Sequence, residues 1–346
     1  MKKNIIWRAA VVLLALTMAT LPLTATNAKY SSYLPAHAGE IKVFHLLPSI
    51  ERADTASSAQ KFDPYSARKG YWAYFLKGEN GAKSSNGSGA GGAPGIVMGV
   101  YNLSADAYFL VGKTRGGAGQ GQGGNGGGAE FIIQSTANTA SHTNNPAPSG
   151  TTVIAVAGGG GGTGSNGSNN KGGHAGASIG STGSVTMPGP QNGSGSWGGA
   201  QGGNTGGVIS TSNNSQNGGG GDGSTYGRKG VASGTYSDGT DGNWFQTGSG
   251  GNGGGSIAYS GGGGGGIYGG GGGATHSSNA GSGGGGGSYS AGGALPNTTT
   301  SATGYTMTKY GNPTSYYQHA FNYFVDRVNA QTATQLVAVL VWLGPA

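Results

Sequence analysis

The chain of 346 residues contains no cysteine, so neither disulfide bonds nor thiol chemistry contribute to its fold or function. Charged residues are scarce as well: they make up 8% of the sequence, against a usual share of about 25%. The formal net charge is +7, but lysine and arginine form no dense cluster. Since nucleic-acid-binding proteins concentrate such residues on one face, we expect no nucleic-acid partner.

Signatures of catalytic and cofactor sites are also missing. No G-x-x-x-x-G-K-[ST] pattern occurs, and the many G-x-G-x-x-G matches follow from glycine content without the βαβ unit of a dinucleotide site. The six histidines lack zinc-site spacing. Glu79 and Glu130, beside the first glycine-rich segments, suit the capping of backbone donors, whereas a polysaccharide hydrolase needs a close carboxylate pair. We therefore predict a protein that is not an enzyme, with no catalytic residues and no cofactor.

One segment gathers the hard oxygen ligands that Ca²⁺ prefers. Asp238, Asp241 and Asn243 lie among turn-forming glycines. Their spacing matches neither the EF-hand nor the G-G-x-G-x-D repeat, and Asx turns between glycine tracts explain the segment more simply. These residues are weak metal candidates, and we otherwise predict no metal site.

Residues 1–28 have the pattern of a secretory signal peptide. Basic residues precede the apolar run 9–19, and small residues end at Ala28, with an alternative cleavage site after Ala38. The apolar run is too short for a good membrane span of about 20 residues. We predict a secreted chain with no transmembrane segment after cleavage, located at a bacterial cell surface or in an extracellular matrix.

Glycine dominates what is present, at 80 of 346 residues, against a usual share of about 7%. Glycine- and serine-rich segments are commonly flexible linkers. Large apolar residues stand inside these tracts, however, and disordered chains are poor in such residues. They are Trp197, Trp244, Phe245, Ile267 and Tyr268. We therefore favour ordered tracts.

The ordered arrangement that suits such tracts is a bundle of polyglycine II helices. This extended helix has three residues per turn and no hydrogen bonds within one strand. Its N–H and C=O groups point outward and must bond neighbouring helices when buried, and a Cβ pointing inward would push the neighbours apart. The predicted scaffold glycines are Gly158, Gly159, Gly160, Gly161, Gly162, Gly261, Gly266, Gly269, Gly273, Gly283 and Gly287.

Apolar, β-branched and aromatic segments flank and interrupt the tracts. They predict strands at 41–47, 71–76, 95–101, 107–112, 130–134, 151–157 and 335–343. Residues 315–330 predict a short amphipathic helix. Since apolar material comes from both ends of the chain, we predict one domain over 39–346, mainly β, with glycine-rich insertions mainly within 78–293.

Aromatic residues in the predicted helix form the densest cluster outside the strands. They are Tyr316, Tyr317, Tyr323 and Phe324. Such side chains either fill the interior or form a face that contacts a protein or a glycan. We take these four as the candidate contact surface.

A series of motifs in a fixed order resembles the glycine-rich domain of the anaplastic lymphoma kinase and leukocyte tyrosine kinase receptors. It comprises GYWAYFLKGENG at 70–81, YFLVG at 108–112, GGNGGGA at 123–129, VIAVAGGGGG at 153–162 and GGGGGGIYGGGGG at 261–273. The resemblance implies a jelly-roll-like β-sandwich with an inserted polyglycine II bundle, and edge strands from 40–70 and 330–346. The family tryptophan after the first strand is absent, and the receptors' small helical protein ligands are not implied here.

The segment Asn27-Ala28-Lys29-Tyr30-Ser31-Ser32 is similar to the region after the signal peptide of TasA-like biofilm fibre proteins. With the composition, this favours a structural or adhesive protein of a cell surface or biofilm matrix that self-associates or binds a protein or a cell-surface glycan. The alternative is a soluble extracellular recognition module for one protein or glycan ligand.

Overall fold

The protein is described by a computed structural model that divides the chain into two units, Met1–Pro48 and Ser49–Ala346. The structure describes residues 50–55, 61–86, 89–138, 151–164, 172–175, 178–179, 185–186, 229, 237–243, 250–254, 260–275, 280–293, 300–301, 309–330 and 335–346, all in the second unit. The predicted signal peptide, the strand at 41–47, Trp197, Trp244 and Phe245 lie outside these residues.

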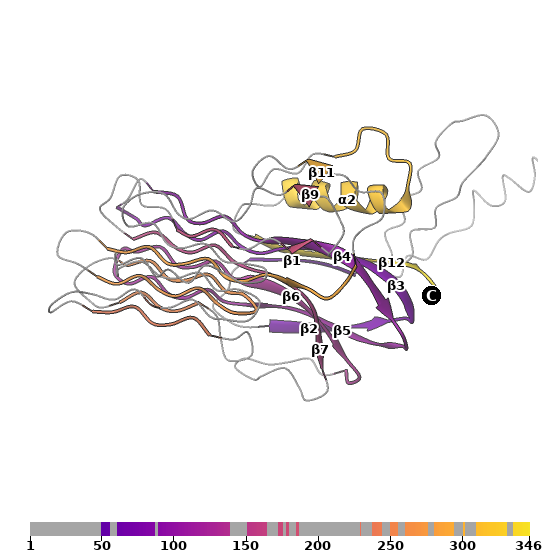
Figure 1. The fold of residues 1–346 in the computed structure, drawn as a ribbon, viewed down its shortest axis with the longest axis horizontal. Coiled ribbons are helices and arrows are strands. Elements are labelled where there is room, and N and C mark those ends of the chain that lie inside the picture. The colour runs from indigo at the N-terminus through magenta and orange to yellow at the C-terminus, as the bar shows by residue number, and fades with distance from the viewer. Residues whose placement is uncertain are drawn as a thin grey trace, which may run out of the picture. The chain divides into compact units, whose positions relative to one another are not determined.

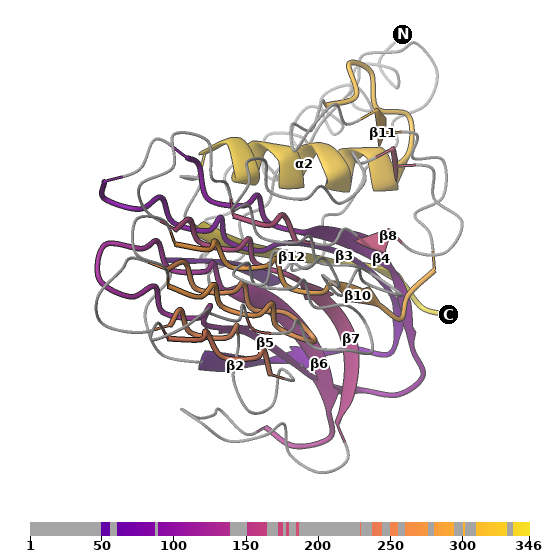
Figure 2. The same ribbon diagram turned by 60° about the vertical axis from the view of Figure 1, so that its left-hand side comes forward.

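The second unit is mainly β and contains two five-stranded sheets (Figures 1 and 2). Sheet 1 has the order β1 (Ile50–Thr55), β12 (Gln335–Gly344), β3 (Gly70–Lys77), β4 (Ile96–Leu103) and β8 (Ser178–Ile179). Sheet 2 has the order β10 (Tyr289–Ser290), β7 (Thr152–Ala157), β6 (Ala129–Ser135), β5 (Ala107–Thr114) and β2 (Lys61–Ala67). The long strands pair antiparallel, and β9 (Val185–Thr186) pairs with β11 (Thr300–Ser301) separately.

Alternation along the strands builds the core between the two sheets. On β3, Trp72, Tyr74 and Leu76 are buried on the inner face with Phe109 of β5 and Ile132 of β6. The Trp72 and Phe109 rings meet edge to face, with centroids 5.2 Å apart. Burying each such side chain stabilises the fold by about 1.5–3 kcal/mol.

The opposite face of sheet 1 is covered by helix α2 (Tyr316–Ala330), which confirms the predicted amphipathic helix. Phe321 and Phe324 pack on Phe75 of β3, and the Phe75 and Phe324 ring centroids are 5.3 Å apart. Ser315 caps the helix, because its Oγ accepts a hydrogen bond from the Gln318 N–H at 3.3 Å.

Six of the predicted strands are confirmed as β3, β4, β5, β6, β7 and β12. The expectation that 40–70 supplies edge strands is met by β1 and β2, and Pro64 is tolerated in β2 because only one side of an edge strand donates to the ladder. The expectation that 330–346 supplies an edge strand is wrong. β12 lies between β1 and β3, where its nearly continuous apolar sequence is buried on both faces.

Candidate functional site in the glycine-rich tracts

The glycine-rich tracts leave the two sheets at one common end. β3, β5 and β7 run directly into glycine-rich segments at their carboxyl ends, and β4 and β6 are entered from such segments. Because neighbouring strands within each sheet are antiparallel, the junctions of that sheet fall at one end of its strands. The tracts then run side by side away from the sheets as extended, wavy ribbons (Figures 1 and 2).

The segment 158–164 donates hydrogen bonds in three directions. Two of them return to the same neighbouring segment every three residues, and the third is shared between the segments 172–175 and 281–288. Gly159 and Gly162 donate to Gly265 and Gly262, at 2.8 and 2.7 Å. The next residues in line, Gly160 and Thr163, donate to Glu79 and Ala82, and the third pair, Gly161 and Gly164, to the Gly173 carbonyl and Ser282 Oγ.

The carbonyl groups of the same segment follow the same rule with other partners. In donor-to-acceptor order, the bonds run from Gly95 to Gly158, Gly92 to Gly161, Gly286 to Gly159, Gly283 to Gly162, Gly127 to Gly160 and Gly124 to Thr163. The segment is thus bonded on all sides to neighbouring segments, through their backbones and, at its two ends, through the hydroxyl groups of Ser288 and Ser282.

The segments around 158–164 are also bonded to one another and close a ring. In order around it they are 79–82, 89–95, 172–175, 281–287, 260–265 and 123–128, and each is hydrogen-bonded to the next. The segment 260–265 belongs to this ring and is itself bonded to 116–120, 250–254 and 269–274. Such packing leaves no solvent around the two inner segments, and every residue of both is buried.

Side chains are excluded from the inner positions by the closeness of neighbouring backbones. A Cβ built on Gly160 would overlap the Gly92 carbonyl, and one on Gly161 would overlap the Gly283 carbonyl. All eleven predicted scaffold glycines lie in the described residues and are buried. A Cβ built on nine of them, Gly158–Gly162, Gly261, Gly266, Gly273 and Gly283, would lie within 2.6 Å of a neighbouring backbone atom, so these positions allow backbones to approach closely.

The candidate metal ligands lie on the outer segment 237–243. Asp238 Oδ2 pairs with the Lys229 ammonium at 2.9 Å, and Asp241 Oδ1 accepts the Lys229 backbone N–H at 2.7 Å. The Asn243 carbonyl accepts the Gly269 N–H, and the residue is exposed. The described part of the chain holds no group of three His, Cys, Asp or Glu residues suited to a metal.

Charged side chains are buried where the sheets meet the tracts. Glu79 Oε2 accepts the Gly128 N–H at 2.8 Å, which confirms its predicted capping role. Burial raises the Glu79 pKa to about 7, although the Gly128 N–H, Lys113 and Lys77 act to lower it. Burial also lowers the Lys77 pKa. Thus a carboxyl group that titrates near neutrality bridges two tracts.

Beside it, Glu130 is fully buried and its Oε1 lies 3.0 Å from Arg52 Nη1. Arg52 Nε in turn lies 3.5 Å from Asp63 Oδ2. These contacts join β1, β2 and β6, so they tie sheet 1 to sheet 2. Sequence reasoning missed them because Arg52 is 78 residues from Glu130.

A buried tyrosine makes a second link that the sequence did not reveal. Tyr74 of β3 hydrogen-bonds Ser290 Oγ of β10 at 2.5 Å and accepts the Gly292 N–H at 3.0 Å. Burial raises the pKa of its hydroxyl. A Cβ on Gly99 or Gly292 would overlap this hydroxyl, so both glycines make room for it.

The predicted aromatic contact surface is only partly at the surface. Phe324 is fully buried against Phe75, so its assignment to that surface is wrong: it faces sheet 1. Tyr316, Tyr317 and Tyr323 are half-buried against the same core. The Tyr323 hydroxyl donates to Glu51 Oε2 at 2.6 Å and accepts from Arg327 Nη2 at 3.0 Å, which explains this tyrosine structurally.

No protein-family model matches the chain, and no curated protein is significantly similar to it. Both resemblances noted in the sequence therefore stay predictions. Across the described residues, none of the helical structure is long and apolar enough for a membrane span.

Proposed function

We propose that the protein is a secreted, non-enzymatic structural or adhesive component of a cell surface or extracellular matrix. Its rigid scaffold combines a jelly-roll-like sandwich with a polyglycine II bundle formed by the glycine-rich tracts. The sandwich ties the tract ends together, and the bundle extends from it as a stiff element.

The observation that carries this proposal is the three-residue repeat of hydrogen-bond directions along 158–164. A helix with three residues per turn returns to the same neighbour after three residues, as Gly159 and Gly162 do. A β-strand would alternate between two directions instead. The closed ring of bonded segments around 158–164 supports a bundle over a single layer.

Rigidity follows from how such a bundle is stabilised. Ordering each glycine costs about 0.5–1 kcal/mol more than ordering alanine. Each backbone hydrogen bond contributes about 0.5–1.5 kcal/mol net, and close Cα–H···O contacts contribute a further 0.5–1 kcal/mol or so. Since gain and cost are of similar size, a tract is ordered only when several neighbours surround it, and the bundle forms cooperatively.

Amide hydrogen exchange followed by mass spectrometry tests the scaffold. We expect strong protection of 158–164 and 260–265, comparable with that of β3 and β12. Exchange at random-coil rates in these segments would refute the bundle and, with it, a stiff structural role.

Light scattering coupled to size-exclusion chromatography tests assembly. A structural protein of a matrix is expected to self-associate as its concentration increases. A strict monomer at high concentration would favour the second candidate, a soluble recognition module for one protein or glycan ligand.

A further inference from the structure

The end of the sandwich opposite the tracts carries a turn whose backbone is fixed by hydrogen bonds from side chains. Arg68 and Lys69 join β2 of sheet 2 to β3 of sheet 1, and both side chains are exposed. Trp72 Nε1 donates to the Arg68 carbonyl at 2.8 Å, and Trp342 Nε1 donates to the Lys69 carbonyl at 3.2 Å. Asp106 Oδ1 accepts the Lys69 N–H at 2.7 Å.

Gly70 completes this turn at a position that only glycine suits. Its φ is 131°, in the left-handed region, and a Cβ there would overlap the Gly344 carbonyl and lie 2.8 Å from Trp342 Nε1. The backbone beneath the two cations is thus fixed by two indole groups, a carboxylate and a tight packing contact. A fixed backbone lowers the entropy lost when exposed side chains bind a ligand.

An exposed aromatic residue follows the two cations in the chain. Tyr71 is the large hydrophobic side chain that stands out as exposed in the described part of the chain, at 42%. On sheet 1 it is in register with the exposed Asn102 on one side and Gly344 on the other. A Cβ at Gly344 would meet nothing within 4 Å, so that side of the strand is open.

We infer that Arg68, Lys69, Tyr71 and Asn102, here called the distal patch, bind an acidic polysaccharide. The apolar C–H face of a sugar ring packs on an aromatic ring, and an amide hydrogen-bonds hydroxyl groups. The Arg68 guanidinium pairs bidentately with a uronate carboxylate, and the Lys69 ammonium pairs with the next acidic group. The turn carries two exposed cations, Arg68 and Lys69, and one carboxylate, Asp106, which is bonded to the Lys69 backbone N–H, so its net charge is positive and attracts a polyanion.

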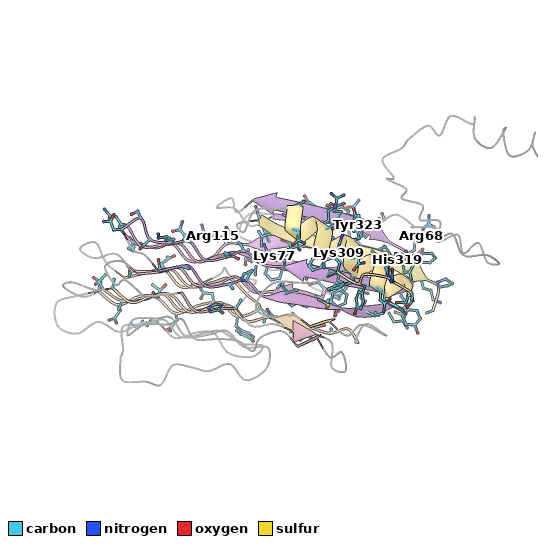
Figure 3. The ribbon with its side chains drawn as sticks, turned by 90° about the horizontal axis from the view of Figure 1, so that it is seen from above. Arg68, Lys77, Arg115, Lys309, His319 and Tyr323 are labelled. Atoms are coloured by element: carbon cyan, nitrogen blue, oxygen red, sulfur yellow. The ribbon has the colours of Figure 1, made fainter. Side chains whose placement is uncertain are left out.

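The position of the distal patch suits attachment of the protein to the polysaccharide through one end of the sandwich. Figure 3 shows Arg68 at one end of the ribbon and Arg115, at the start of a tract, toward the other. This inference rests on the proposed adhesive role: the distal patch holds the polymer while the tracts project away from it.

The test is the binding of the full-length protein to polygalacturonate, with neutral dextran as the reference polymer, measured by isothermal titration calorimetry. We expect binding to polygalacturonate that weakens as salt rises toward about 0.5 M, and no binding to dextran. The double variant Arg68→Gln/Lys69→Gln is expected to lose at least about tenfold in affinity, because two charge-assisted contacts are lost. Tyr71→Ala is expected to weaken binding about fivefold, whereas Tyr71→Phe keeps the ring and the affinity.

A matched control removes the same charge elsewhere. Lys83→Gln/Arg115→Gln neutralises two exposed cations on the tracts and should leave the affinity unchanged. Equal weakening by both double variants would overturn the proposal, as would full affinity in Arg68→Gln/Lys69→Gln, no binding to polygalacturonate at low salt, or equal binding to dextran. Tighter binding to poly-glutamate or to single-stranded DNA would also overturn it and identify another class of partner. Hydrogen exchange of the tracts tests the scaffold independently of the distal patch. Failure of polysaccharide binding is therefore distinguishable from failure of the proposed scaffold.

Discussion

The sheets and the glycine-rich tracts both have to hydrogen-bond their buried backbone groups, but they have opposite side-chain requirements. In the sheets, ladders between strands satisfy the backbone, and large side chains such as Phe75 and Trp72 supply the burial that stabilises them. In the tracts, hydrogen bonds between segments also satisfy the backbone, but side chains are excluded and the backbones touch directly. The sheets are therefore weakened by removing atoms, and the tracts by adding them.

The largest effect is expected where the sheets depend on bulk. Phe75→Ala removes a fully buried ring that packs on Phe321 and Phe324, and should lower the free energy of unfolding by about 3–5 kcal/mol. Urea denaturation measures this loss. A change below about 1 kcal/mol would show that α2 contributes little to the stability of sheet 1.

The opposite change, the addition of a side-chain atom, is tested in the tracts. Gly161→Ala adds one methyl group against the Gly283 carbonyl and should cost about 3 kcal/mol, at the upper end for overpacking, because backbone cannot move aside as a side chain can. Gly293→Ala is the matched control, since its Cβ would meet nothing within 4 Å. Equal unfolding midpoints for the two variants would contradict close packing of the tracts.

The junction between the two parts should respond to pH. The Glu79 pKa is raised to about 7 from its usual 4.5, so the folded protein keeps a proton that the unfolded chain releases between these values. The stabilising effect is complete below about pH 4.5 and is lost as pH rises through about 7, a decrease of about 3 kcal/mol.

Urea titrations at several pH values compare the wild type with Glu79→Gln, which stays neutral and still accepts the Gly128 N–H. The variant should lack this part of the decrease, whereas Glu51→Gln, outside the junction, should keep it. If the free energy of unfolding had the same pH dependence in the wild type and in Glu79→Gln, titration of Glu79 in this range would be ruled out.

The smallest effect concerns the link from sheet 1 to β10. Tyr74→Phe keeps the buried ring but removes the hydroxyl that bonds Ser290 and Gly292, so it should cost about 1–2 kcal/mol. Faster amide exchange at 289–293, with β3 unchanged, would locate the loss at β10. Uniform acceleration throughout both sheets would instead indicate that Tyr74 serves the whole core.

Much of the fold could be predicted because local patterns carry it. Period-two and β-branched segments predicted β3 to β7 and β12, and 3.6-residue spacing predicted α2. The short β8 and β10 have only two residues each, too few for a pattern. The burial of Phe324 was missed because the same spacing that predicts a helix does not state which aromatic residues its neighbour will cover.

The sequence by itself determined where glycine replaces every other residue, and hence where backbones are able to touch. Only the tertiary structure decided which segments touch: Gly159 meets Gly265 and Gly161 meets Gly173, in a bundle whose strand-borne tracts leave the two sheets at one end. Glycine runs are interchangeable as sequence, so nothing in them encodes a partner. The register comes from the side-chain-rich sheets, where a shift of one residue would turn the apolar face outward.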